Sequence, residues 1–182
     1  MNDQDGCQKV YTWQDLLDAL QHNAKNYDLE KIREAYDLAC KIHEHQTRLT
    51  GEPYINHPTA TVIILAELGM DTDSIVAGLL HDAVEDTDMD IRTIQRRFGK
   101  DVALMVSGVT KMGRITFTSR EDFQVENIRK MLIAMSEDIR VIIIKLADRL
   151  HNMRTCEGWP EQKRRDKALE TMEVYAPIAH RL

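Results

Sequence analysis

Cysteine, aromatic residues and excess positive charge are all scarce in this chain of 182 residues. The three cysteines, Cys7, Cys40 and Cys156, lie far apart, are odd in number and form no C-x-x-C pair. They therefore exclude a disulfide framework and a structural cysteine-zinc site, and they suit a reducing compartment, so we expect a cytoplasmic protein. Aromatic residues make up 5% of the chain while methionines number nine, which favours packed aliphatic helices over a β-sandwich or barrel.

The net charge is −6, so a broad nucleic-acid surface is not expected, although a local basic patch can still bind a small anion. The polar, acidic residues at the start of the chain do not form a signal peptide. The most hydrophobic segment, residues 139–150, is interrupted by charged residues and is too short to span a membrane. With 43% hydrophobic and 30% charged residues, the composition predicts a globular domain.

Apolar residues recur at helical spacing along almost the whole chain, with no fixed repeat or low-complexity segment. We therefore predict an all-α fold, with a loose N-terminus at residues 1–12 and one domain at residues 13–182. Residues 111–118 show no periodicity and predict a mobile loop. One helix, capped by Asp71 or Asp73, is expected to contain the acidic cluster described below. A first helix is predicted to begin at Trp13. Further helices are predicted over residues 29–46, 58–68, 91–98, 100–110, 119–135 and 161–175.

Residues 139–144 are the ambiguous part of the chain, because their β-branched side chains suggest a buried strand. The apolar positions, however, follow helical spacing as far as Leu150, and Asp138 is a suitable N-cap. The residues at this spacing are Ile139, Ile142, Ile143, Leu146 and Leu150, and we therefore predict a central buried helix. The pattern stops mid-element at Leu182, so we expect this chain to be a fragment of a longer protein.

The sequence His81-Asp82-Ala83-Val84-Glu85-Asp86 follows the apolar run at residues 75–80 and is the strongest chemical signal in the chain. An imidazole and three carboxylates are expected within about two turns of one helix. Buried carboxylates are costly unless a cation or hydrogen bonds compensate them, and a bound metal ion supplies that compensation. His81 and Asp82 are expected as metal ligands, with Glu85 and Asp86 acting on a metal-bound water or its surroundings.

The remaining ligands should come from other helices, and His57 and Asp148 are the best candidates. His57 stands just before Pro58 at a predicted helix start, and Asp148 interrupts an apolar helix. Taken alone, His57 fits a capping residue, Asp148 fits a salt bridge with Lys145 or Arg149, and the acidic pair fits a solvated helix end. Together they form a mixed nitrogen and oxygen set that suits Mn²⁺, Fe²⁺ or Zn²⁺ more than Ca²⁺.

This joint pattern resembles the HD superfamily of metal-dependent phosphohydrolases, and more closely the RelA/SpoT-homologue family. Residues 51–58, Gly-Glu-Pro-Tyr-Ile-Asn-His-Pro, are similar to that family's G-E-P-Y-I-x-H-P segment. Residues 80–87 resemble its H-D-x-x-E-D-T element. The resemblance begins at about Lys31 and implies an HD-domain helical bundle. Further matching segments are residues 98–102, 109–111, 126–131, 145–155 and 173–182.

The resemblance implies a hydrolase domain that removes the 3′-pyrophosphate of guanosine tetra- or pentaphosphate (ppGpp, pppGpp), giving GDP or GTP and pyrophosphate in the stringent response. It implies Mn²⁺ as the cofactor, and a C-terminal synthetase domain and regulatory regions as partners in the full-length protein. The residues that match the family's metal ligands are His57, His81, Asp82 and Asp148, and those that match its catalytic acidic pair are Glu85 and Asp86. The residues that match its substrate-binding positions are Arg48, Thr50, Asn152, Thr155 and Arg165. Of these, Arg48 matches the residue that faces guanine, and Arg165 matches a position near the phosphates.

One position departs from the family pattern. Many relatives have Arg-Lys-Ser before Gly-Glu-Pro, whereas this chain has Arg48-Leu49-Thr50, so a cation that could contact phosphate or ribose is missing. The intact H-D-x-x-E-D residues predict activity. Two alternatives stay open from sequence: a nucleotide-sensing module with little turnover that controls an attached synthetase, and a hydrolase of another nucleotide or cyclic dinucleotide. Arg48 and its loop argue against the second alternative.

Overall fold

The structure is a computed structural model that describes residues 9–23, 25–113 and 137–182. Within these ranges the regular structure is helical, with no β-strand and one isolated bridge between Thr47 and Pro53. The all-α prediction is confirmed. No helix in these ranges is both long enough and apolar enough to cross a membrane.

The helices begin where the sequence supplies side-chain caps. Thr12 and Asp15 form a reciprocal capping box at the first helix, and aspartates cap four later helices by accepting from backbone N–H groups. A 3₁₀ turn covers Cys156–Gly158, and a π-helical turn covers Thr171–Tyr175. The α-helices are α1 Trp13–Gln21, α2 Leu29–Ile42, α3 Asn56–Glu67, α4 Thr72–Leu79, α5 Ala83–Asp86, α6 Ile91–Phe98, α7 Lys100–Gly113, α9 Ile139–Arg154, α10 Glu161–Glu170 and α11 Ala176–Ala179.

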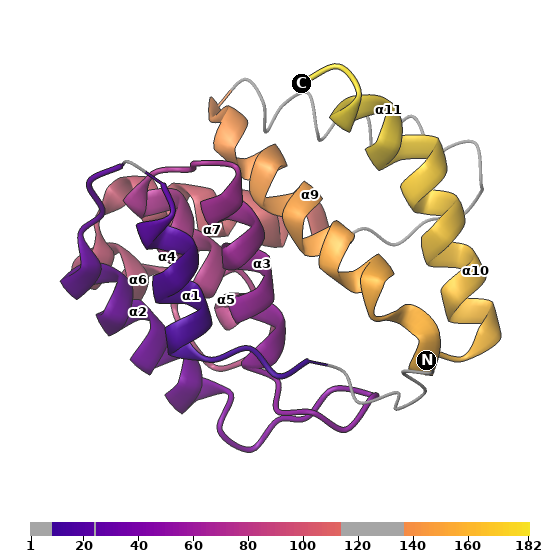
Figure 1. Cartoon of the computed structure of the whole chain (residues 1–182), viewed down its shortest axis with the longest axis horizontal. Coiled ribbons are helices and arrows are strands. Elements are labelled where there is room, and N and C mark those ends of the chain that lie inside the picture. The colour runs from indigo at the N-terminus through magenta and orange to yellow at the C-terminus, as the bar shows by residue number, and fades with distance from the viewer. Residues whose placement is uncertain (1–8, 24, 114–136) are drawn as a thin grey trace.

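Helix α9 lies between the group formed by α1 to α7 and the C-terminal helices α10 and α11 (Figure 1). The ambiguous segment is helical and central, as predicted. Two of the residues that carry the helical spacing, Ile139 and Leu150, are about two-fifths exposed, while Val141 and Ile144 are buried. Since α3, α4 and α7 all contact α9, more than one side of this helix is buried.

Two glycines allow the helices around the site to pack closely. A Cβ at Gly78 on α4 would lie 2.7 Å from Leu65 Cδ1 on α3. A Cβ at Gly108 on α7 would lie 2.9 Å from Val141 Cγ2 on α9. These contacts leave no room for a side chain, so both glycines hold neighbouring helices at short separation.

Several predicted boundaries are corrected by the structure. The second helix ends at Ile42 rather than residue 46, and α3 begins at Asn56, two residues before Pro58. Residues 111–113 continue α7 instead of starting a loop. The predicted helix over residues 161–175 becomes α10 followed by the π-helical turn. Residues 1–8 and 114–136, which include most of the predicted loop and the predicted helix at 119–135, lie outside the described residues.

Candidate metal centre

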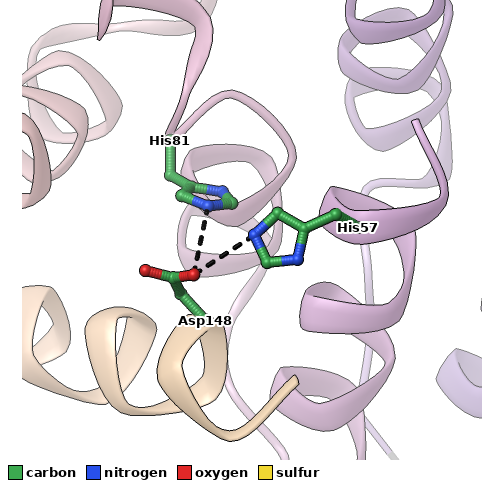
Figure 2. A group of neighbouring side chains, drawn as sticks. All are labelled: His57, His81 and Asp148. Atoms are coloured by element: carbon green, nitrogen blue, oxygen red, sulfur yellow. Dashed lines mark ion pairs between the residues drawn. The ribbon is translucent and has the colours of Figure 1, made fainter. Parts of the chain in front are cut away.

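Three buried side chains from distant parts of the sequence converge beside α9 (Figure 2). His57 comes from the first turn of α3, His81 from the segment between α4 and α5, and Asp148 from the middle of α9. Their ligand atoms all lie within 4.8 Å of one another. His57 Nε2 is 3.2 Å and His81 Nε2 is 4.0 Å from the same oxygen, Asp148 Oδ1.

The sequence prediction of one helix through the acidic cluster is wrong. Helix α4 ends at Leu79, and α5 begins at Ala83, so His81 and Asp82 lie in the turn between them. This break brings Asp82 to both histidines: its Oδ1 lies 3.2 Å from His81 Nε2, and its Oδ2 lies 3.7 Å from His57 Nε2. Asp82 therefore adds a fourth potential ligand to the three buried ones.

The orientation of His81 fits a cation. Its Nδ1 lies 2.7 Å from the carbonyl oxygen of Gly78, which can only accept, so Nδ1 carries the proton. The other ring nitrogen, Nε2, is buried and lies 3.2 Å from Asp82 Oδ1, and it has no well-aligned hydrogen bond among the described residues. A carbonyl that fixes one imidazole nitrogen and leaves the other directed at carboxylates is the usual arrangement of a metal-binding histidine.

The electrostatics of the site also fit a divalent cation. Burial raises the pKa of Asp148, but Lys145 and the histidines outweigh burial and hold this pKa well below its usual range. Burial raises the pKa of Asp82 as well, and His81 outweighs that effect and lowers it. Burial lowers the pKa of both histidines. At His57 this effect prevails and the pKa stays lowered, whereas at His81 the carboxylates of Asp82 and Asp148 outweigh burial and raise the pKa to about 9. The ionised carboxylates of Asp82 and Asp148 are thus stabilised by positive charge beside them, and a bound metal ion can supply such charge.

Tyr54 connects the metal centre with the predicted catalytic pair, and sequence reasoning gave it no role. Its hydroxyl lies 2.8 Å from Asp82 Oδ2 and 2.6 Å from Asp86 Oδ2. Burial and these two carboxylates raise the pKa of Tyr54, so the phenol keeps its proton. The ring stacks on His43 with centroids 4.6 Å apart. The only signal in the sequence is its position three residues before His57 in the matched motif.

A cavity of about 580 Å³ opens beside these ligands, and both acidic and basic residues line it. The carboxylates include the predicted catalytic residues Glu85 and Asp86. The Trp159 ring also lines the cavity. The basic lining residues are Arg48, Lys145, Arg149, Lys163 and Lys167.

A neighbouring cavity of about 790 Å³ also reaches Glu85 and Asp86, but among the described residues neither histidine of the cluster nor any lysine or arginine lines it. Two further aspartates line it instead, at positions 88 and 90. An anionic ligand is therefore better matched to the smaller cavity, which basic residues and the candidate metal ligands line together.

The predicted substrate residues fall into two groups. Arg48 and Asn152 line the cavity and connect to the metal centre, because Arg48 Nη2 donates to Asn152 Oδ1 at 2.9 Å and Asn152 Nδ2 donates to Asp148 Oδ1 at 2.5 Å. Thr155 Oγ1 lies 3.5 Å from the same Arg48 nitrogen.

Thr50 and Arg165 are not among the residues that line this cavity. Thr50 lies against Gly158, and Arg165 forms an exposed ion pair with Glu161 at 2.7 Å. On α10, Lys163 and Lys167 face the cavity instead.

Helix α10 is held against α9 by a largely buried ion pair. Arg149 Nη2 lies 2.9 Å from Glu170 Oε1, and its guanidinium lies 4.4 Å from the centre of the Tyr175 ring. Burial lowers the pKa of Arg149, but Tyr175 and Glu170 outweigh burial and raise it. This contact holds α10 where Lys163 and Lys167 line the cavity.

Comparisons with known proteins identify the family to which the chain belongs. The HD domain family matches residues 35–182. The chain is 46% identical to the bifunctional (p)ppGpp synthase/hydrolase SpoT of Escherichia coli over 95% of this chain and 25% of that protein. It is 50% identical to a guanosine-3′,5′-bis(diphosphate) 3′-pyrophosphohydrolase of Aquifex aeolicus over 93% of this chain and 24% of that protein. The chain thus spans about a quarter of the length of these curated relatives.

A solved structure supports the same assignment. It is described as a metazoan ortholog of SpoT that hydrolyzes ppGpp and plays a role in starvation responses, and it superimposes with a TM-score of 0.67 and 31% identity. The alignment covers 82% of this chain and 86% of that one. By sequence over most of its length and by fold, this chain is a member of the HD domain family.

Proposed function

We propose that this chain is a metal-dependent hydrolase that removes the 3′-pyrophosphate of guanosine tetra- or pentaphosphate, giving GDP or GTP. The observation that supports it most is the convergence of His57, His81, Asp82 and Asp148 beside a cavity that is also lined by lysine and arginine side chains. The relatives named as 3′-pyrophosphohydrolases and the ppGpp-hydrolysing ortholog provide the substrate class.

The proposed cofactor is Mn²⁺, held by these two histidines and two aspartates. These imidazole and carboxylate side chains would hold the ion, since a mixed nitrogen and oxygen ligand set suits Mn²⁺. When bound, the ion supplies charge neutralisation and lowers the pKa of a coordinated water toward neutrality.

Glu85 and Asp86 are the proposed acid–base pair. Both line the cavity with the ligands, so one of them can orient and deprotonate the attacking water. Tyr54 donates toward Asp86 and fixes that carboxylate relative to Asp82. In-line attack of water on the phosphorus bonded to the ribose 3′-oxygen breaks the P–O3′ bond. The 3′-oxygen leaves and takes up a proton, giving GDP or GTP, and the attacked group departs as pyrophosphate. Lysines that line the cavity offset the developing negative charge.

Arg48 is the proposed guanine-binding residue, because a planar guanidinium held at one edge by Asn152 can stack on a purine. Asn152 and Thr155 keep this guanidinium in place, and the family resemblance adds Thr50 and Arg165 as further proposed substrate contacts. Lys163 and Lys167 are additional candidates for the phosphates from their place in the cavity wall. Leu49, which replaces the usual lysine, also lines the cavity and is 65% exposed.

For the whole protein, we propose a cytoplasmic enzyme in which a synthetase domain and regulatory regions follow this domain. The support is the length of the relatives, of which this chain covers 18% to 25%, and the name of the bifunctional E. coli protein.

The test is incubation of the chain with guanosine tetraphosphate, with and without Mn²⁺, followed by identification of the products. We expect GDP and pyrophosphate only with the ion, and no turnover for Asp82→Ala. Asp73→Ala is the matched control, since Asp73 lies on α4 and pairs with Lys31 away from the cavity.

Near-normal hydrolysis by Asp82→Ala would contradict the proposed metal centre. Saturable binding of the nucleotide without pyrophosphate release would instead identify a sensing module. Hydrolysis of other nucleotides but not of guanosine tetraphosphate would contradict the proposed substrate and leave the proposed metal-dependent hydrolysis in place.

A further inference from the structure

His151 lies behind His57, on the side facing away from the proposed metal centre, and no role has been assigned to it. The two rings are 2% and 4% exposed, and their Nδ1 atoms are 2.8 Å apart. We infer that His151 is a positioning residue that sets which nitrogen of His57 carries the proton, and so prepares Nε2 to bind a cation. The inference rests on the proposed metal centre but not on the identity of the substrate.

The contact is a hydrogen bond between the two rings. At 2.8 Å, one Nδ1 must donate and the other must accept. Among the described residues, His57 Nδ1 hydrogen-bonds to no other group, so His151 alone controls its proton.

Two arrangements of protons are possible for the pair. In the first, His57 Nε2 donates to Asp148 Oδ1, which is 3.2 Å away and can only accept, and His57 Nδ1 accepts from His151. In the second, His57 Nδ1 donates to His151, and Nε2 offers a lone pair for a cation. The shared proton moves from His151 to His57, one proton leaves His57 Nε2 and one is taken up at His151 Nε2, so the pair keeps two protons in total.

An imidazole suits this position because its Nδ1 can donate in one arrangement and accept in the other. A leucine can do neither. An asparagine places an amide near the same point and can present either its oxygen or its NH₂ group. The acceptor behind a histidine ligand typically changes metal affinity about 10- to 100-fold when it is removed.

The test compares His151→Leu and His151→Asn in the full chain, by titration with Mn²⁺ in the absence of any nucleotide. We expect the Kd for Mn²⁺ to be about 10- to 100-fold higher in the leucine variant than in the unmodified chain. In the asparagine variant the Kd should lie close to that of the unmodified chain. Thr110→Val is the matched control, because it removes a buried hydrogen bond to Val106 O on α7 without touching the metal centre. Its Kd should equal that of the unmodified chain.

A second measurement needs no variant. Long-range ¹H–¹⁵N spectra of the histidine rings, recorded without metal and with diamagnetic Zn²⁺, should show the His151 proton at Nδ1 in the first state and at Nε2 in the second. An unchanged His151 tautomer overturns the inference, as does a folded leucine variant with unaltered Kd. Manganese binding with the expected tautomers but no hydrolysis of guanosine tetraphosphate would refute the proposed substrate and leave the role of His151 standing.

Discussion

Removing the metal ion should make the stability of this protein fall as the pH rises above neutrality. The reason is His81, which is fully buried between Asp82 and Asp148 and has its pKa raised from 6.5 to about 9 in the folded state. A group whose folded pKa is raised stabilises the protein fully below its unfolded pKa, and the stabilisation disappears as the pH passes the folded value.

A shift of this size corresponds to about 3 kcal/mol when the ring is fully protonated. Between pH 6.5 and 8.5 most of it is lost, so the free energy of unfolding should fall by about 2 kcal/mol. A bound divalent ion replaces the proton as the partner of the two carboxylates. The metal-loaded protein should therefore keep or gain stability over the same interval, because deprotonated ligands bind the ion more tightly.

The assay is urea unfolding at several pH values in this interval, with a chelator or with excess Mn²⁺ in deoxygenated buffer. Asp82→Asn is the informative variant, since Asp82 is the largest influence that raises the His81 pKa, and its loss should move the pH dependence to lower pH. Metal-free protein whose stability stays level or increases from pH 6.5 to 8.5 would refute this account of the site.

Three further outcomes follow from contacts around the cavity. Tyr54→Phe keeps the ring but removes the hydroxyl that joins two carboxylates, so kcat should fall about 10- to 100-fold with little change in Tm; unchanged kcat in steady-state assays would exclude a positioning role. Gly78→Ala places a Cβ 2.7 Å from Leu65 Cδ1, and the free energy of unfolding in urea should fall by about 1–3 kcal/mol. An unchanged free energy of unfolding would mean that α3 and α4 can move apart at little cost. Arg48→Lys keeps the charge but loses the planar contact to Asn152, so KM should rise about tenfold with kcat little changed; a kcat effect alone would argue against substrate binding by Arg48.

Much of the fold could be predicted because its determinants are local. Helical spacing, with aspartate caps at Asp71 and Asp138, located α4 and α9 before any contact was known. The spacing could not show which sides of α9 are buried, since that depends on three other helices that pack against it. The helix predicted to run through the acidic cluster was also wrong, because nothing in the local pattern marks the break after Leu79.

The candidate ligands His57, His81, Asp82 and Asp148 were chosen from sequence because imidazoles and carboxylates next to apolar runs need compensation, and this chemistry is independent of fold. Their distances, and the fact that Asp82 faces both rings, depend on the turn between α4 and α5.

The sequence by itself determined that this chain is helical, which residues could hold a cation, and that the motifs resemble a phosphohydrolase family, because periodicity, capping and residue chemistry act over a few positions. Only the tertiary structure decided which side chains support those ligands. Tyr54 reaches Asp82 across 28 positions and His57 meets His151 across 94, and no local pattern encodes such pairs. They exist because close packing of α3, α4 and α9 fixes each ring and carboxylate in one place.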